Sequence, residues 1–515
     1  MTNTTNLQPG IQALLDHVAK AKSDPQPNSA TSQLRAKWAA ARKQRPVPSE
    51  PMTPTPPREW AGEPAFQLPG EWLGMRSIPA AIMGRHWMTM GETGSGKTVS
   101  AVQPLTHSLL TYQLANGDRA SLLVIDPKDE LAGWIRKKLD AAGESDRLVV
   151  VSPELRVVFF EGLQHLSITD RLALLESIAP NYYRDPDGHS AHWIELGRSM
   201  LRELVQAEAL YREKHPDGSL MEDARADLTD LAGGAMDSEA DRSFFGDMKT
   251  LLNYARSSHR ALKRAQGVFA KIAQEAGLPA RIADPFGRYA STSDLIEQFN
   301  YVVMTLDPLL EALCNPDVQR LVELSPFEFG GGEGTLSVRE QIENGKVLLF
   351  SPGAIAHEST NVVGRVLKTK FFQASFCRKN KARPVGYVCD EFQRFITSDP
   401  ESGEQSFLDR CRAHRVICVL ATQSVASIEY AIGNDRRSNS AISVILNNTA
   451  GKIFMRNTDP STMGAMRNLL PAAPLGSPHV TEVRPATTLK PGEAYYLLAD
   501  GKWGRKQIQL QPGLQ

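Results

Sequence analysis

A glycine-rich stretch at residues 91–98 has the residue types and spacing that bind phosphate. It consists of Gly91, Glu92, Thr93, Gly94, Ser95, Gly96, Lys97 and Thr98, and it fits the pattern G-x-x-x-x-G-K-[ST]. Glycines let the backbone curl, so that several N–H groups and the positive end of a following helix point at one phosphate. Lys97 would then reach the β- and γ-phosphates, and Thr98 would hold Mg²⁺. The stretch predicts a nucleotide-binding loop with ATP and Mg²⁺ as cofactors.

Two adjacent carboxylates, Asp390 and Glu391, end an apolar run that begins at Val385. Side chains diverge at the end of a strand, so Asp390 can face the Mg²⁺ held by Thr98 while Glu391 faces the water that attacks the γ-phosphate. A hydrolytic enzyme needs both a metal anchor and a group that orients or deprotonates water. An apolar run followed by Asp-Glu is common, so the pair predicts this chemistry only together with the phosphate-binding loop.

Gln423 follows a second apolar run, Val416 to Ala421. A polar side chain at the carboxyl end of a parallel strand faces the nucleotide crevice, so Gln423 is a candidate sensor of the γ-phosphate. Two alternatives stay open: Thr422 could be the sensor, or Gln423 could simply belong to a turn.

Three arginines, Arg410, Arg412 and Arg415, precede the same run. An arginine stabilises negative charge on a transferred phosphoryl group, and in ring ATPases the neighbouring subunit can supply it. We favour Arg412 for this role. The alternative is that all three arginines belong to a solvated or ion-paired face.

A basic cluster consists of Arg378, Lys379, Lys381 and Arg383. Such a cluster can neutralise DNA phosphates. Basic residues are also favoured at helix ends, so a purely structural role is the alternative.

The composition limits the possible classes of protein. A chain of 515 residues is too long for a single core, so we expect two or three structural units. Its 58 basic and 58 acidic residues leave no net charge, so any nucleic-acid surface must be local. We find neither a long apolar window nor a secretory signal, and the five cysteines form no C-x-x-C pair, which is typical of a reducing cytosol. No histidine or cysteine spacing predicts a metal site beyond Mg²⁺.

The elements that must position these residues alternate between strands and helices. We expect a helix from Val99 to Leu114 and a hairpin within 493–510. Apolar runs predict strands at 85–90, 121–126, 148–152, 346–351, 385–390, 416–421 and 452–455. This alternation is typical of an α/β domain with a mainly parallel sheet.

The chain divides into three parts by composition and periodicity. Residues 1–62 are rich in proline and polar residues and predict a disordered leader. Residues 167–334 show apolar positions at helical spacing and predict an all-α domain. The nucleotide-binding domain would then consist of residues 63–166 and 335–515, interrupted by the helical insertion.

With these motifs placed, the chain resembles the type IV secretion coupling proteins of conjugation, which are RecA-like P-loop ATPases. The resemblance covers roughly residues 84–455. Besides the loop at 91–98, it rests on three motifs: the DPKDEL stretch at 126–131, CDEF at 389–392 and ATQS at 421–424. It implies a RecA-like domain interrupted by an all-α domain.

The resemblance also implies roles. It implies Lys97 and Thr98 on nucleotide and Mg²⁺, Asp390 and Glu391 in hydrolysis, Gln423 as sensor and Arg412 as an inter-subunit finger. Asp126 and Lys128 would lie at the nucleotide crevice or at a subunit interface.

The function implied is that of an ATP-hydrolysing motor, a homohexamer, that recruits or pumps single- or double-stranded DNA toward a secretion channel. Its partners would be relaxase and relaxosome proteins and channel components. Two alternatives stay open: a DNA translocase of the HerA or FtsK type that is not linked to secretion, and a substrate-recruitment platform with a regulatory ATP site.

One departure from the family concerns the N-terminus. Family members usually carry transmembrane helices there, whereas this chain has its proline-rich leader. We therefore expect a cytoplasmic protein, and leave open a peripheral location at the inner face of the cytoplasmic membrane through a separate anchor protein.

Overall fold

The structure is a computed structural model. It describes residues 60, 62–160, 168–178, 191–232, 243–280, 282, 284–324, 334–353, 355, 357–397, 403–432, 436–470 and 486–508. The predicted leader therefore lies outside the described residues, apart from Trp60 and Gly62. Trp60 is buried, packs edge-on against Phe66 and fills the space beside Gly84. The packed part of the chain thus already includes Trp60, slightly before the predicted boundary at Glu63.

One nine-stranded sheet forms the centre of the fold, in the order β14-β13-β12-β3-β11-β10-β4-β9-β5. Neighbouring strands are parallel except for the pairs β12 with β13 and β13 with β14. The strands are β3 (Trp87–Met90), β4 (Ser121–Ile125), β5 (Leu148–Val150), β9 (Val347–Phe350), β10 (Val385–Cys389), β11 (Val416–Thr422), β12 (Gly451–Phe454), β13 (Glu493–Leu497) and β14 (Trp503–Gln507). The mainly parallel sheet predicted from the sequence is confirmed.

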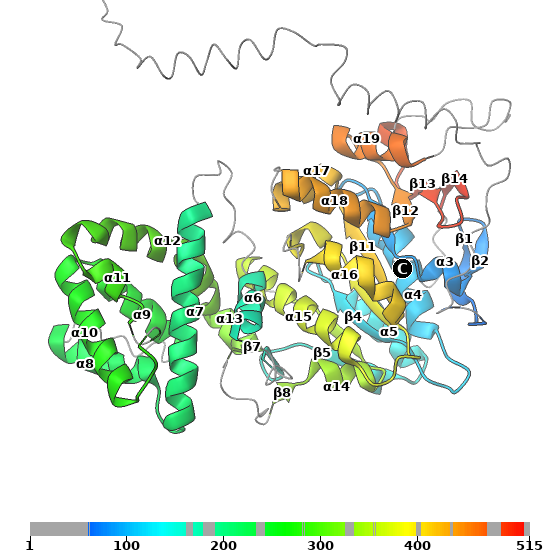
Figure 1. The fold of residues 1–515 in the computed structure, drawn as a ribbon. Coiled ribbons are helices and arrows are strands. Elements are labelled where there is room, and N and C mark those ends of the chain that lie inside the picture. Colours follow the sequence, from blue (N-terminus) through cyan, green and yellow to red (C-terminus); the bar gives the residue numbers. More distant parts are fainter. Residues whose placement is uncertain are drawn as a thin grey trace, which may run out of the picture. The chain divides into compact units, whose positions relative to one another are not determined.

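Both faces of the sheet are buried. Successive side chains along a strand point to opposite sides, so each strand contributes to two cores. In β4, Leu122 and Val124 join one apolar core, and Leu123 and Ile125 join the other. The first core is completed by helices α4 (Gln103–Thr111) and α5 (Ala132–Ala141) and by a hairpin of β1 (Phe66–Trp72) and β2 (Met75–Ile78). The second is covered by α15 (His357–Cys377) and α16 (Glu404–Cys411), on the other side of the sheet in Figure 1. The result is a three-layered α/β domain.

The helix predicted from Val99 to Leu114 is divided. A π-helical segment, Thr98–Val102, precedes α4, whose second residue is Pro104. Proline has no N–H to donate to the carbonyl four residues earlier, that of Ser100. The indole Nε1 of Trp72 donates to that carbonyl instead, at 2.7 Å. The β1–β2 hairpin, which the sequence analysis did not predict, therefore supports the helix that follows the glycine-rich loop.

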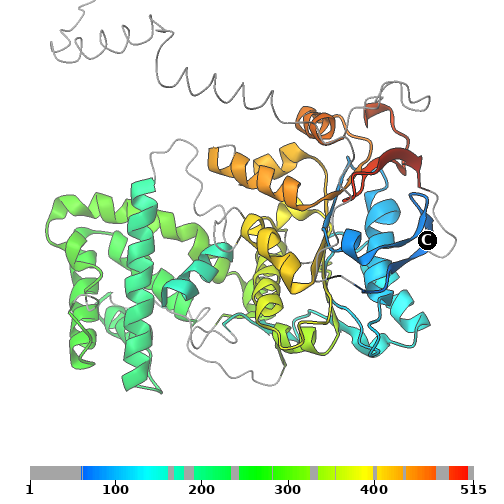
Figure 2. The same cartoon turned by 45° about the vertical axis from the view of Figure 1, so that its right-hand side comes forward.

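The inserted segment is mainly helical. Helices α7 to α12 group together in both views (Figures 1 and 2), and a buried glutamate, Glu208, receives the N–H of Met221 at the start of α8. The helices are α6 (Ile168–Ile178), α7 (Ala191–Lys214), α8 (Leu220–Ala232), α9 (Phe244–Arg256), α10 (His259–Glu275), α11 (Gly287–Ala290), α12 (Ile296–Leu313) and α13 (Pro316–Leu321). A small parallel sheet of β6 (Arg156–Val158), β7 (Val322–Glu323) and β8 (Thr335–Leu336) joins the two ends of the insertion. The predicted fold class, an α/β domain with a mainly parallel sheet that is interrupted by helices, is confirmed.

One remaining helix lies near the start of the described residues, and four lie in the second half of the chain. They are α3 (Ala80–Met83), which precedes β3, and α14 (Val338–Glu343), α17 (Val425–Ile432), α18 (Arg436–Asn448) and α19 (Pro460–Leu469). In the part of the chain that the structure describes, no helix has the length and apolar character needed to cross a bilayer.

Candidate active site

The glycine-rich loop leaves the carboxyl end of β3 and leads into the π-helical segment. Gly94 and Gly96 have φ angles of 75° and 91°, in the left-handed region that favours glycine. A Cβ on Gly91 would lie 2.7 Å from the Ser95 Oγ and 2.8 Å from the Met455 Cβ. The three glycines are therefore required by the tight path of the backbone.

The loop forms a cradle with unused hydrogen-bonding capacity. The Ser95 hydroxyl is buried and has no hydrogen-bond partner among the described residues. The Lys97 Nζ donates to the carbonyls of Gly91 at 2.6 Å and Glu92 at 3.2 Å. Burial lowers the pKa of Lys97, while the nearby carboxylates Glu391 and Asp390 oppose that shift. A glycine-rich loop that contains a buried lysine and a buried hydroxyl without a partner fits the polyphosphate of a nucleotide.

Asp390 meets Thr98 at the end of the loop. The Thr98 Oγ1 donates to the Asp390 Oδ2 at 2.8 Å, across 292 positions of sequence. Asp390 is almost fully buried, and this burial raises the pKa of its carboxyl, while the hydrogen bond from Thr98 lowers it. A hydroxyl and a carboxylate at this spacing are oxygen ligands of the kind that Mg²⁺ prefers. The residues predicted to hold Mg²⁺ are therefore neighbours in space.

Glu391 lies next to this pair with its carboxylate enclosed. Its Oε1 contacts the Lys128 Nζ, and its Oε2 accepts from the Gln393 Nε2 at 2.5 Å and from the Gln423 Nε2 at 3.1 Å. Burial acts to raise the pKa of Glu391, but the contact with Lys128 and the hydrogen bond from Gln393 leave that pKa below its usual value. Gln423 thus lies against Glu391, at the carboxyl end of β11 as expected.

The turn that carries Lys128 follows β4 and is held by Asp126. The Asp126 Oδ2 accepts the backbone N–H groups of Leu131 at 2.6 Å and Ala132 at 3.0 Å. Its Oδ1 is buried without a partner among the described residues. Burial raises the pKa of the Asp126 carboxyl to about 6. Asp126 therefore shapes the turn, and Lys128 extends from it to Glu391.

No protein-family model matches the chain. Among curated proteins, a stretch of 71 residues, 14% of the chain, is 38% identical to the DEAD-box ATP-dependent RNA helicase 20 of Arabidopsis thaliana. A match of the same length and identity exists with the ATP-dependent RNA helicase DBP2 of Chaetomium thermophilum. These matches span only 14% and 13% of the helicases' own lengths.

Solved structures match over most of the chain. The bacterial conjugative coupling protein TrwBdeltaN70, in an unbound form, superposes with a TM-score of 0.54 at 15% identity, over 87% of this chain and 90% of that one. The chain has the fold of a conjugative coupling protein. The plasmid coupling protein TrwB in complex with ADP and Mg²⁺ superposes with a TM-score of 0.51, at 15% identity and over 87% of this chain and 91% of that one.

Arg412 lies near the amino ends of the parallel strands, whereas the glycine-rich loop lies at their carboxyl ends. It begins a short 3-10 turn, Arg412–His414, between α16 and the amino end of β11, and its side chain is exposed. Its neighbours are engaged within the chain: Arg415 pairs with Glu63, and Arg410 lies over the ring of Phe376. The structure therefore separates Arg412 from the other predicted site residues and leaves it on the surface.

The basic cluster at residues 378–383 is partly buried. The buried Arg378 donates to the carbonyls of Ser375, Asn380, Arg383 and His414. The buried Arg383 side chain donates to the carbonyl of Arg119 and pairs with Asp118. Of the two interpretations of this cluster, the structure favours the structural one for both arginines.

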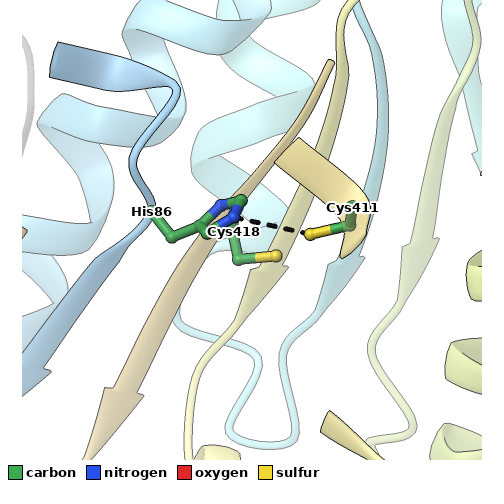
Figure 3. Close-up of side chains that lie close together, drawn as sticks. All are labelled: His86, Cys411 and Cys418. Atoms are coloured by element: carbon green, nitrogen blue, oxygen red, sulfur yellow. Dashed lines mark hydrogen bonds between the residues drawn. The ribbon is translucent and has the colours of Figure 1, made fainter. Parts of the chain in front are cut away.

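A second polar cluster lies at the amino edge of the sheet, where the parallel strands begin (Figure 3). Among the described residues, His86, Cys411 and Cys418 form a group whose ligand atoms lie within 4.8 Å of one another. The His86 Nδ1 accepts the backbone N–H of Cys418 at 3.2 Å, so a neutral ring carries its proton on Nε2, 3.4 Å from the Cys411 Sγ. Burial raises the pKa of the Cys418 thiol well above its usual value. With both ring nitrogens of His86 engaged and all three side chains buried, the cluster is satisfied as part of the core.

The sequence analysis missed several residues around the glycine-rich loop and Glu391. The N–H of Gly492 donates to the carbonyl of Ser95 at 2.9 Å, so the segment before β13 covers the loop. Arg456, just after β12, pairs with Glu92 of the loop. Gln393 contacts Glu391 from two positions later in the chain. These residues follow no motif, and only their proximity to the ends of predicted strands could have indicated them.

Proposed function

We propose that this chain is a P-loop ATPase and a DNA-transfer motor, which recruits or pumps DNA toward a type IV secretion channel in conjugation. The hydrogen bond from Thr98 to Asp390 carries the proposal. It joins the last residue of the proposed phosphate-binding loop, which follows β3, to the acidic end of β10, two strands away in the sheet. The likeness of the fold to coupling proteins supports the choice of motor.

Each residue has a separate task in the proposed reaction. Lys97 binds the β- and γ-phosphates of ATP, and Thr98 and Asp390 hold Mg²⁺. When bound, Mg²⁺ withdraws negative charge from these phosphates. Glu391 orients the attacking water and accepts its proton, and Gln423, in contact with Glu391, senses the γ-phosphate.

Arg412 serves the site of a neighbouring subunit. The seven residues of β11 separate it from Gln423, and seven residues of strand span about 23 Å. Because that span is longer than an arginine side chain, Arg412 reaches a nucleotide only in another copy of the chain. The proposed role therefore requires a ring, proposed to be a homohexamer, with nucleotide at the interfaces between subunits.

The proposed partners follow from the motor. They are single- or double-stranded DNA, the relaxase with other relaxosome proteins, and components of the secretion channel or a separate membrane anchor. The proposed location is the cytoplasm, with docking at the inner face of the membrane through that anchor.

One experiment tests this function: the ATPase rate of the full chain measured without DNA, with single-stranded DNA and with double-stranded DNA. Lys97→Ala should abolish binding of a fluorescent ATP analogue. Glu391→Gln should retain binding and lose turnover. Mass measurement with and without nucleotide would report the oligomer.

The same experiment separates the alternatives. Normal turnover by Lys97→Ala or Glu391→Gln would overturn the ATPase assignment. An ATPase rate that DNA leaves unchanged, together with binding of a secreted protein to the helical insertion, would favour a recruitment platform. Stimulation by DNA in a protein that binds no relaxase would favour a translocase unconnected to secretion.

A further inference from the structure

The carboxylate of Glu391 is occupied on both of its oxygens. Lys128 contacts Oε1, and the amides of Gln393 and Gln423 both donate to Oε2. The Glu391 side chain is only 3% exposed. A group that takes a proton from water must present a free lone pair to that water. In this arrangement three protein donors take three of the roughly four lone-pair positions of the Glu391 carboxylate, and the side chain is enclosed.

The backbone at Glu391 shows that these contacts hold it in place. Its φ is 53°, in the left-handed region that costs a residue with a Cβ roughly 1 kcal/mol or more. Its N–H donates to the Asp390 Oδ1 at 2.9 Å. Such a conformation persists only where the surroundings stabilise it, so the three donors help to maintain the position observed.

Lys128 is positioned independently of the phosphate-binding loop. It extends from the turn after β4, where Asp126 accepts two backbone N–H groups and the Ser351 Oγ donates to the Asp129 Oδ1 at 2.5 Å. The Lys128 side chain is 34% exposed, whereas Glu391 is enclosed. The lysine can therefore move toward solvent, and while it stays in place it holds the Glu391 Oε1.

We propose that Lys128 is a positioning residue that restrains Glu391 and slows ATP hydrolysis until it moves away. The inference rests on the proposed function, in which Glu391 accepts the proton of the attacking water. In that step a water O–H bond breaks and its proton passes to the Glu391 carboxylate. The water oxygen bonds to the γ-phosphorus, and the bond to the β-phosphate oxygen breaks with its electron pair leaving on ADP. With Lys128 on Oε1, the oxygen that would take the proton faces an ammonium group.

Lys128→Met keeps the length of the side chain and removes the charge. It should raise kcat for ATP in the absence of DNA about tenfold, as expected if the free position of Glu391 is populated about a tenth of the time in the unaltered protein. KM should change little, because Lys128 contacts Glu391 rather than the nucleotide loop. Lys128→Arg keeps a cation and should retain the low rate.

Two comparisons make the result specific. Lys137→Met removes an exposed lysine from α5 and should leave kcat unchanged. In a Glu391→Gln background, Lys128→Met should have no effect, because the restraint acts through that carboxylate.

A fall in kcat for Lys128→Met, with nucleotide binding intact, would mean that the lysine places Glu391 productively, and would overturn the restraint. An unchanged kcat would overturn it too. Both results leave the ATPase assignment standing as long as Lys97→Ala and Glu391→Gln remain inactive. If the unaltered chain hydrolyses no ATP, the proposed function fails first and the restraint fails with it.

Discussion

The parallel strands of the central sheet end at its carboxyl edge and begin at its amino edge. Residues with left-handed backbone conformations lie at both of these edges, but they have different roles. At the carboxyl edge, Asp129 and Glu391 have φ angles of 59° and 53°, and at the amino edge His86 and Arg415 have 57° and 53°. The carboxyl edge directs its polar side chains at one another, around the glycine-rich loop. The amino edge directs them at backbone groups and at the core.

This difference supports placing the proposed chemistry at the carboxyl edge. Around Glu391 a cation, a carboxylate and two amides share hydrogen bonds that a substrate can exchange. Around Arg415 the donors are committed to Glu63 and to the carbonyl of Ala382, which no substrate replaces. The strained backbone at the carboxyl edge therefore lies within the proposed site, whereas the strained backbone at the amino edge is held by contacts that stabilise the fold.

The largest effect is expected at the amino edge, from its exposed arginine. Arg412→Ala should lower the ATPase rate about 10³-fold, the lower end of the effect of an arginine finger supplied by a neighbour. Thermal stability should be unchanged, because the side chain is exposed. The measurement is kcat together with the melting temperature.

A mixing experiment tests whether Arg412 acts across subunits. Arg412→Ala and Lys97→Ala are each expected to have little or no activity alone, but a mixed ring would contain interfaces where an intact loop meets an intact arginine. Partial recovery of ATPase activity on mixing is expected. No recovery at any ratio, in rings shown to contain both variants, would contradict a role in the neighbouring site.

A smaller effect is expected for the metal anchor at the carboxyl edge. Asp390→Asn keeps the shape and weakens a Mg²⁺ ligand, so kcat at physiological Mg²⁺ should fall about 10²-fold. Raised Mg²⁺ should restore part of the activity. A loss that Mg²⁺ does not affect would argue against metal binding at Asp390.

Asp126 should make the stability of the carboxyl edge depend on pH. Its folded pKa of about 6 lies above the ordinary value of 3.8, so ionisation costs stability as pH rises through this window. Relative to the neutral Asp126→Asn, the unaltered protein should lose about 2 to 3 kcal/mol between pH 4 and pH 7. The measurement is the difference in melting temperature between the two proteins across this range. A difference that is constant with pH would contradict the raised pKa.

The smallest effect is expected at Arg415, whose role is structural. Arg415→Ala removes the pairing with Glu63 and the cation over the ring of Trp60, and should cost about 1 to 2 kcal/mol of unfolding free energy. Arg415→Gly loses the same contacts but tolerates the left-handed backbone, so it should be about 1 kcal/mol more stable than the alanine variant. Denaturant unfolding measures both, and kcat should not change. A loss of activity in either folded variant would extend the functional region to this residue.

Much of the fold could be predicted from local patterns. Apolar runs of strand length predicted all the strands of the parallel part of the sheet within one or two residues at each end. The glycines and lysine of the loop predicted its shape, because φ angles at Gly94 and Gly96 are a local property of the backbone. The β1–β2 hairpin and the short strands β6, β7 and β8 were missed, because they are too short or too irregular for a period to be visible.

The amino-acid sequence by itself determined that a phosphate-binding loop, a pair of carboxylates at a strand end and a glutamine at another strand end exist in one α/β domain. Each of these features could be predicted because it depends on the types and spacing of residues that are close together in the sequence. Only the tertiary structure decided which side chains meet: Thr98 with Asp390, Lys128 with Glu391, and Arg378 with the carbonyls around it. These contacts join residues that belong to different elements, and their geometry depends on strand order and burial. No period in the sequence encodes it.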